Sequence, residues 1–174
     1  LAHKWTEQTL VPVGDLAGKR CLEIGAGAGG VTRWLADKVG PTGSVVAIDK
    51  DPRFLREMPD NVEVVEADLT SYEPDGEFDL IHSRAVLIYV PDREQVVARL
   101  AGHLAPDGWL ACEEVLFFSV AEFIDRQAGA PVPDSGAMMS LFDLGGMDAI
   151  RFPMQLPVTF RGLGLVDVHA QVNA

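Results

Sequence analysis

The residues best suited to chemistry in this chain are glycines that follow a short apolar segment. Residues 21–24 are apolar apart from Glu23, glycines stand at positions 25, 27, 29 and 30, and apolar residues recur at helical spacing over 31–39. This pattern predicts a buried strand, a tight turn and a helix. Glycine tolerates positive φ and lets a ligand approach the backbone, and the helix that follows offers unpaired N–H groups to the turn. The segment predicts a ligand-binding turn without naming the ligand.

Two ligand classes fit the spacing of these glycines. They satisfy G-x-G-x-x-G, the dinucleotide pattern, and equally G-x-G-x-G, with Glu23 two residues before the first glycine. Asp49 follows a second apolar segment at residues 44–48. A carboxylate there, at the end of a parallel strand beside the turn, can accept hydrogen bonds from both ribose hydroxyls. Asp51 is better placed than Asp49 to cap the helix expected near Pro52.

The run Glu-Ile-Gly-Ala-Gly-Ala-Gly at residues 23–29 resembles motif I of the class I S-adenosylmethionine-dependent methyltransferases. An acid before the glycines suits this cofactor, which carries an ammonium group and a sulfonium where a dinucleotide carries two phosphates. The resemblance covers roughly residues 16–115, including the Phe78-Asp79 strand. It implies that Asp68 accepts a hydrogen bond from the adenine amino group while Leu69 donates its backbone N–H. The cofactor-binding residues that it implies are Glu23, Gly25, Ala26, Gly27, Gly29, Asp49, Lys50, Asp68, Leu69 and Ser83.

The elements that must position these residues are alternating strands and helices. Strands are expected at residues 21–24, 44–48, 61–67, 77–82 and 109–114, and a helix is expected from Pro91-Asp92 until the turn at 105–108. The expected fold is a single α/β domain over 1–174. It has a doubly wound, mostly parallel sheet with helices on both faces, and its cofactor lies at the strand carboxyl ends.

The end of the chain is harder to assign to that fold. Residues 162–170 resemble the family's sixth strand. For the last, antiparallel strand of the family, three alternatives stay open: it is missing from this sequence, the sheet is short, or part of 116–160 takes its place. The sequence begins at Leu1 rather than Met, so we expect that an N-terminal piece is absent.

The resemblance implies methyl transfer from S-adenosylmethionine to an O, N or C atom of a small-molecule acceptor. Positioning in a dry pocket can supply most of the acceleration, and a base helps only if the acceptor must lose a proton. Candidates for that base, or for orienting the acceptor, are Tyr89, which replaces a histidine of many relatives, His82, Glu113 and Glu114. An N-terminal flap over residues 1–15 and a lid over 116–160 are expected to shape the acceptor pocket.

Composition narrows the function further. The formal charge is −12, from 26 acids against 14 bases, and no Lys/Arg cluster interrupts it, so a nucleic-acid or anionic membrane surface is disfavoured. No apolar run approaches the ~18 residues of a membrane span. The two cysteines, Cys21 and Cys112, fall in expected strands and are interpreted as reduced core residues. Because the four histidines are scattered, no metal site is expected. We expect a cytoplasmic monomer or homodimer.

Two other functions remain open. A non-catalytic S-adenosylmethionine-binding module would carry the same turn and acids without turnover. An NAD(P)-dependent oxidoreductase would also use the glycine turn, but no Tyr-x-x-x-Lys pair is present, since Tyr89 is followed by Arg93.

Overall fold

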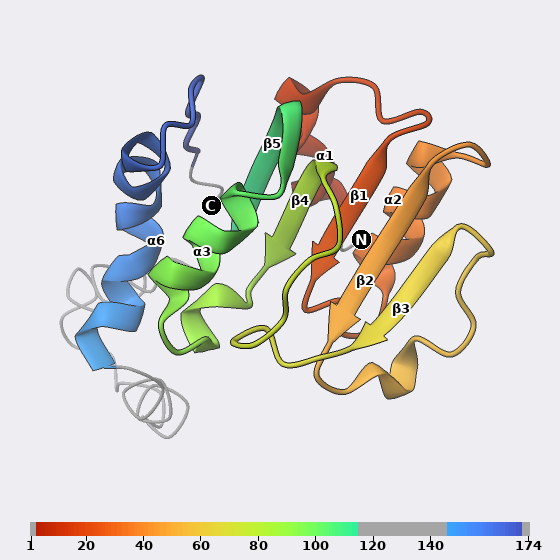
Figure 1. Ribbon diagram of the computed structural model, residues 1–174, viewed down its shortest axis with the longest axis horizontal. Helices are drawn as coiled ribbons and strands as arrows, with labels where there is room; N and C mark the ends of the chain where they lie inside the picture. Colours follow the sequence, from red (N-terminus) through yellow and green to blue (C-terminus); the bar gives the residue numbers. More distant parts are fainter. Residues whose placement is uncertain (1–2, 115–145, 172–174) are drawn as a thin grey trace, which may run out of the picture.

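Five parallel strands form the centre of the molecule (Figure 1). The computed structural model describes residues 3–114 and 146–171. The strands lie in the order β3-β2-β1-β4-β5, so that β1 pairs with β2 on one side and with β4 on the other. Their bounds are Arg20–Ile24 (β1), Ser44–Asp49 (β2), Val62–Glu66 (β3), Phe78–Arg84 (β4) and Leu104–Glu113 (β5). The expected doubly wound α/β fold is confirmed, with its switch point between β1 and β4.

Helices cover both faces of the sheet. One face packs against α2 (Gly30–Val39), with α1 (His3–Thr9) beside it, and the other against α3 (Arg93–Ala101) and α6 (Gly146–Gly162). Short 3-10 turns are η1 (Val11–Val13), η2 (Pro52–Phe54) and η3 (Leu87–Tyr89). Because β1 and β2 are buried on both sides, their sequences are almost continuously apolar. The described part of the expected N-terminal flap forms α1 and η1.

The turn expected at residues 105–108 was placed wrongly. Helix α3 ends at Ala101, and β5 begins at Leu104, so residues 105–108 lie inside a strand. They form an irregularity there: Asp107 has φ +63° and the register with β4 shifts between Phe78 and Leu80. A Cβ at Gly108 would lie 2.8 Å from the Phe78 carbonyl oxygen, so the turn residues allow a close strand approach.

The sixth strand expected at residues 162–170 is also wrong. Helix α6 extends to Gly162, and no strand follows among residues 163–171. The Leu165 N–H donates to the Phe160 carbonyl and the Gly164 N–H to the Arg161 carbonyl, with Gly164 at φ +83°. This is a Schellman helix end, which uses the backbone donors that a strand would need. Of the expected lid at 116–160, residues 116–145 lie outside the described residues and the rest belongs to α6.

Both cysteines are free thiols, Cys21 fully buried and Cys112 half-buried. Within the described ranges, no helix is both long and apolar enough to cross a membrane, and no group of three metal-ligating side chains occurs.

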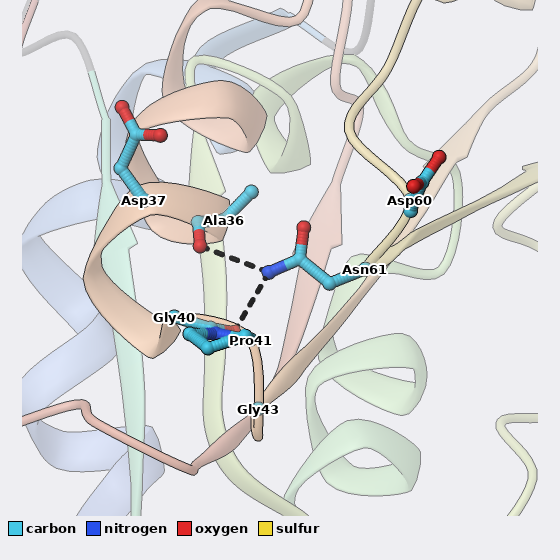
Figure 2. A pocket seen from close by; sticks show the side chains of 7 residues that line it. All are labelled: Ala36, Asp37, Gly40, Pro41, Gly43, Asp60 and Asn61. Atoms are coloured by element: carbon cyan, nitrogen blue, oxygen red, sulfur yellow. Dashed lines mark hydrogen bonds between the residues drawn. The ribbon is translucent and has the colours of Figure 1, made fainter.

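The amino edge of the sheet holds a shallow hollow beside the end of α2 (Figure 2). Asn61, just before β3, donates from Nδ2 to the carbonyl oxygens of Ala36 and Gly40, at 3.0 Å each. Each of these carbonyls also accepts one backbone N–H, that of Gly40 and that of Gly43, so Asn61 adds a second hydrogen bond to each at the end of α2. Because α2 begins at the glycine turn and ends here, the hollow lies at the opposite end of the helix from that turn.

Asn61→Ala should lower the free energy of unfolding by about 1–2 kcal/mol, because two half-buried hydrogen bonds are lost. Asn61→Asp should be worse, since it places a carboxylate against the negative end of α2. Urea denaturation measures both, with the exposed neighbour Asp60→Ala as control. An Asn61→Ala variant as stable as the Asp60→Ala control would contradict the assigned role.

Candidate functional site

The glycine turn lies at the carboxyl end of β1 and is tight on both flanks. Gly25, Gly27 and Gly29 all have positive φ, at +66°, +54° and +73°. A Cβ at Gly25 would collide with Val86, and one at Gly29 with Met58. At Gly27 no such neighbour lies closer than 4.0 Å, and the residue is exposed. Gly27 is therefore the point of the turn where a ligand can reach the backbone.

Asp49 ends β2 with its carboxylate directed at this turn. Its Oδ2 accepts the Gly27 N–H at 2.7 Å, and its Oδ1 accepts the Asp51 N–H at 2.9 Å. Each carboxylate oxygen can accept a second hydrogen bond. Asp51 accepts the Arg53 N–H and caps η2, as expected. The open backbone of Gly27 and the carboxylate of Asp49 form one surface.

Asp68 follows β3 and lies next along the same edge. Hydrogen bonds from the Thr70 hydroxyl and N–H, and then from the Lys50 ammonium at 3.0 Å, hold the pKa of Asp68 well below its usual range. The Ala67 N–H donates to the Asp49 carbonyl, which joins the ends of β2 and β3. Asp68 is thus ionised and restrained, near the predicted ribose ligand Asp49. The neighbouring Leu69 is buried.

Glu23 and His82 meet inside the sheet rather than on its edge. Glu23 is 2% exposed and His82 is 0% exposed, and the His82 Nδ1 lies 2.7 Å from the Glu23 Oε2. The His82 Nε2 lies 3.2 Å from the Glu113 Oε1. Burial disfavours a charged ring, but the attraction of Glu23 and the hydrogen bonds that the ring donates to both carboxylates outweigh it and raise the pKa of His82 to about 9.

Helix α1 is tied to the same group of residues. The buried Thr6 hydroxyl donates to Glu113 Oε2 at 3.2 Å and accepts a hydrogen bond from Arg84 at 3.4 Å. Sequence reasoning missed Thr6, because a lone threonine in a short helix carries no spacing signal. The contact between Glu113 and His82 could not be predicted either, because it depends on the pairing of β4 with β5.

The remaining candidates lie apart from this network. Tyr89, on η3, is 47% exposed, whereas Ser83 is buried on the opposite face of β4 from His82. Glu114 accepts the N–H groups of Val86 and Leu87, at 3.4 and 2.9 Å, and so caps η3. Burial raises the pKa of Glu114 to about 6.

A family model described as "Methyltransferase domain" matches residues 22–112 of the chain. Among curated proteins, the chain is similar to Methyltransferase str3 of Strobilurus tenacellus, with 31% identity over 142 residues, which cover 79% of this chain and 50% of that protein. The chain spans about half the length of the curated relatives that it matches first.

Two solved structures illustrate the likeness in fold. A SAM-dependent methyltransferase from Aquifex aeolicus has a TM-score of 0.63 at 19% identity, covering 91% of this chain and 78% of that one. The N-methyltransferase NodS from Bradyrhizobium japonicum, solved with S-adenosyl-L-homocysteine, has a TM-score of 0.53 at 24% identity, covering 63% and 58%. At these identities the likeness establishes the class I methyltransferase fold.

Glu114→Gln should stabilise the protein at neutral pH by about 1–2 kcal/mol. The raised pKa means that the folded chain binds more protons than the unfolded chain between pH 4.5 and about 6. The free energy of unfolding therefore falls as pH rises through this window. Glutamine cannot ionise and can still accept the Leu87 N–H, so the Glu114→Gln variant should not show this fall. Denaturation curves across the window test this, with the exposed Glu94→Gln as control. Equal shifts in both variants would contradict it.

Proposed function

Because the chain belongs to the methyltransferase domain family, we propose that it binds S-adenosylmethionine and transfers the methyl group to an O, N or C atom of a small-molecule acceptor. The main support for the proposal is the surface formed by Gly27 and Asp49. Gly27 has a positive φ and open space beside its Cα, and its N–H donates to the Asp49 carboxylate at 2.7 Å.

The residues at this edge fit the proposed cofactor. Asp49 retains acceptor capacity on both oxygens for the two ribose hydroxyls. Asp68, held ionised beside Lys50, would accept the adenine amino group, with the Leu69 N–H as the accompanying donor. Glu23 would carry the negative charge that faces the ammonium group. Asp49 and Asp68 thus lie along the ends of β2 and β3, and Glu23 lies buried near the end of β1.

The chain's own contribution to the reaction is binding and orientation. Bound S-adenosylmethionine would supply a methyl group on a sulfonium centre, with a neutral thioether as leaving group. The protein then has to hold the acceptor atom in line with that methyl group and exclude water. Tyr89 is exposed on η3, after β4, where its hydroxyl is available to orient an acceptor. His82 has carboxylate oxygens at both ring nitrogens, so its geometry favours a supporting role over that of a general base.

The proposal extends to the kind of acceptor and the cellular setting. A formal charge of −12 supports a small molecule over nucleic acid. The two free thiols support a reducing, cytoplasmic location, and we propose a monomer or homodimer. An acceptor panel with methyl-labelled cofactor tests turnover directly. One labelled product supports the enzyme, and binding without any product would favour a non-catalytic module.

Asp49→Ala should weaken binding of S-adenosylhomocysteine roughly ten- to a hundredfold, because hydrogen bonds between a charged acceptor and the ribose are lost. Titration calorimetry measures the Kd. Asp37→Ala, which removes the same charge from the exposed face of α2 at the far hollow, is the matched control. If both variants bind like the unmodified chain, the ribose role of Asp49 is wrong.

Gly27→Ala should reduce cofactor affinity more than stability. The added methyl has room in the protein but stands where the ligand would approach, and the positive φ adds roughly 1–2 kcal/mol of strain. Gly14→Ala also places a side chain at positive φ, at an exposed position with no atom within 4 Å of its Cβ. We expect both variants to lose stability and Gly27→Ala alone to lose affinity; equal affinities would refute the proposed approach of the ligand.

A further inference from the structure

A polar network lies under α1, within the face of the sheet that α2 also covers. Glu23 comes from β1, His82 from β4 and Glu113 from β5, and the two His82 ring nitrogens face one carboxylate each. His82 is 0% exposed and Glu23 is 2% exposed. Packing alone does not require a carboxylate at each ring nitrogen of a buried histidine.

This geometry determines the charge of the ring. A neutral imidazole has one N–H and one lone pair. At 2.7 and 3.2 Å from two carboxylates, the lone pair of a neutral ring would face an acceptor oxygen. Two N–H donors satisfy both contacts, so the ring is an imidazolium.

The charges around the ring agree with an imidazolium. Glu23 and Glu113 contribute two negative charges, and Arg84, linked to Glu113 through the Thr6 hydroxyl, contributes a positive one. A charged ring places a positive charge between the two carboxylates, whereas a neutral ring would leave their negative charges without a cation between them. Two further titratable groups lie nearby. Burial raises the pKa of the Cys21 thiol to about 12, so the thiol stays neutral. Glu7 of α1 accepts a hydrogen bond from the Trp34 indole N–H.

Glu23 is also close to the glycine turn in the chain. It lies two residues before Gly25, against whose backbone the Val86 side chain packs. Resting on the function proposed above, we propose that His82 is a positioning residue: its imidazolium holds the Glu23 carboxylate in the orientation that receives the ammonium group of the cofactor. A general base would need a free nitrogen, and a positioning residue does not.

The alternative is an ion network that only stabilises the fold. Variants of His82 separate the two roles, because asparagine retains a donor near the Nδ1 position without a charge, whereas leucine retains neither. Binding of S-adenosylhomocysteine should weaken roughly tenfold in His82→Asn and further in His82→Leu. Two controls should bind like the unmodified chain: His103→Asn, whose ring bonds the Gly76 carbonyl, and Asn61→Ala, which is destabilised at the far edge of the sheet.

The pH profile gives a readout that a stabilising role would not move. In the unmodified chain, affinity should fall as pH rises through about 9, where the ring loses its charge. Glu113→Gln removes one of the two carboxylates that favour the imidazolium, so the same fall should begin at lower pH. His82→Asn should show only the fall that the ligand's own ammonium group produces when it loses its proton. Nitrogen-15 spectra of the ring should show both nitrogens protonated at neutral pH.

Several results would overturn the inference. These are His82→Asn binding as tightly as the unmodified chain, an unaltered pH profile in Glu113→Gln, or a ring with one unprotonated nitrogen at neutral pH. If His82→Leu does not fold, the asparagine and Glu113→Gln variants still decide. Failure of the unmodified chain to bind S-adenosylhomocysteine would refute the proposed function and this inference together, whereas normal binding with unaffected variants would refute this inference alone.

Discussion

The parallel pairing of β1 with both β2 and β4 is the constraint on which the rest of the structure depends. Parallel strands end on the same edge, so the glycine turn after β1, Asp49 at the end of β2 and His82 near the end of β4 are brought to one region. The connections on the two sides of β1 run in opposite directions along the sheet, and in open α/β sheets ligands bind at such a switch point. A ligand that binds there meets the turn after β1 and the carboxylate of Asp49 at the end of β2.

Acidic groups reach this edge in two different electrostatic settings. Asp49 and Asp68 are partly exposed, and backbone or side-chain donors keep them in place. Glu23 is buried and needs a cation beside it, because an unpaired carboxylate in the interior costs several kcal/mol. His82 supplies that charge across the β1–β4 pair. This region thus combines two acceptors that a ligand can reach from solvent, Asp49 and Asp68, with a buried carboxylate, Glu23, whose orientation His82 holds.

Much of this arrangement could be predicted from local sequence, because βα units place strand ends and turns together. The positions of the glycine turn, Asp49 and Asp51 follow from apolar runs and turn residues alone. Two other predictions were wrong because local residue types did not decide the backbone. Residues 105–108 have turn residue types, but their pairing with β4 places them in a strand. Residues 162–170 have strand residue types, but their first donors are used at the end of α6. The partners of His82 could not be predicted, since they depend on strand order and register.

The turn itself distinguishes between the two ligand classes that its glycines allow. In a dinucleotide site the free N–H groups of such a turn bind a pyrophosphate. Here the Gly27 N–H already donates to Asp49 at 2.7 Å, so an arriving phosphate would compete with a resident carboxylate and be repelled by it. A neutral hydroxyl or a cation meets the opposite condition, because the same carboxylate attracts it. With Glu23 behind the turn and Asp68 beyond it, the charge along this edge favours a ligand whose sugar donates hydrogen bonds and whose other end is positive.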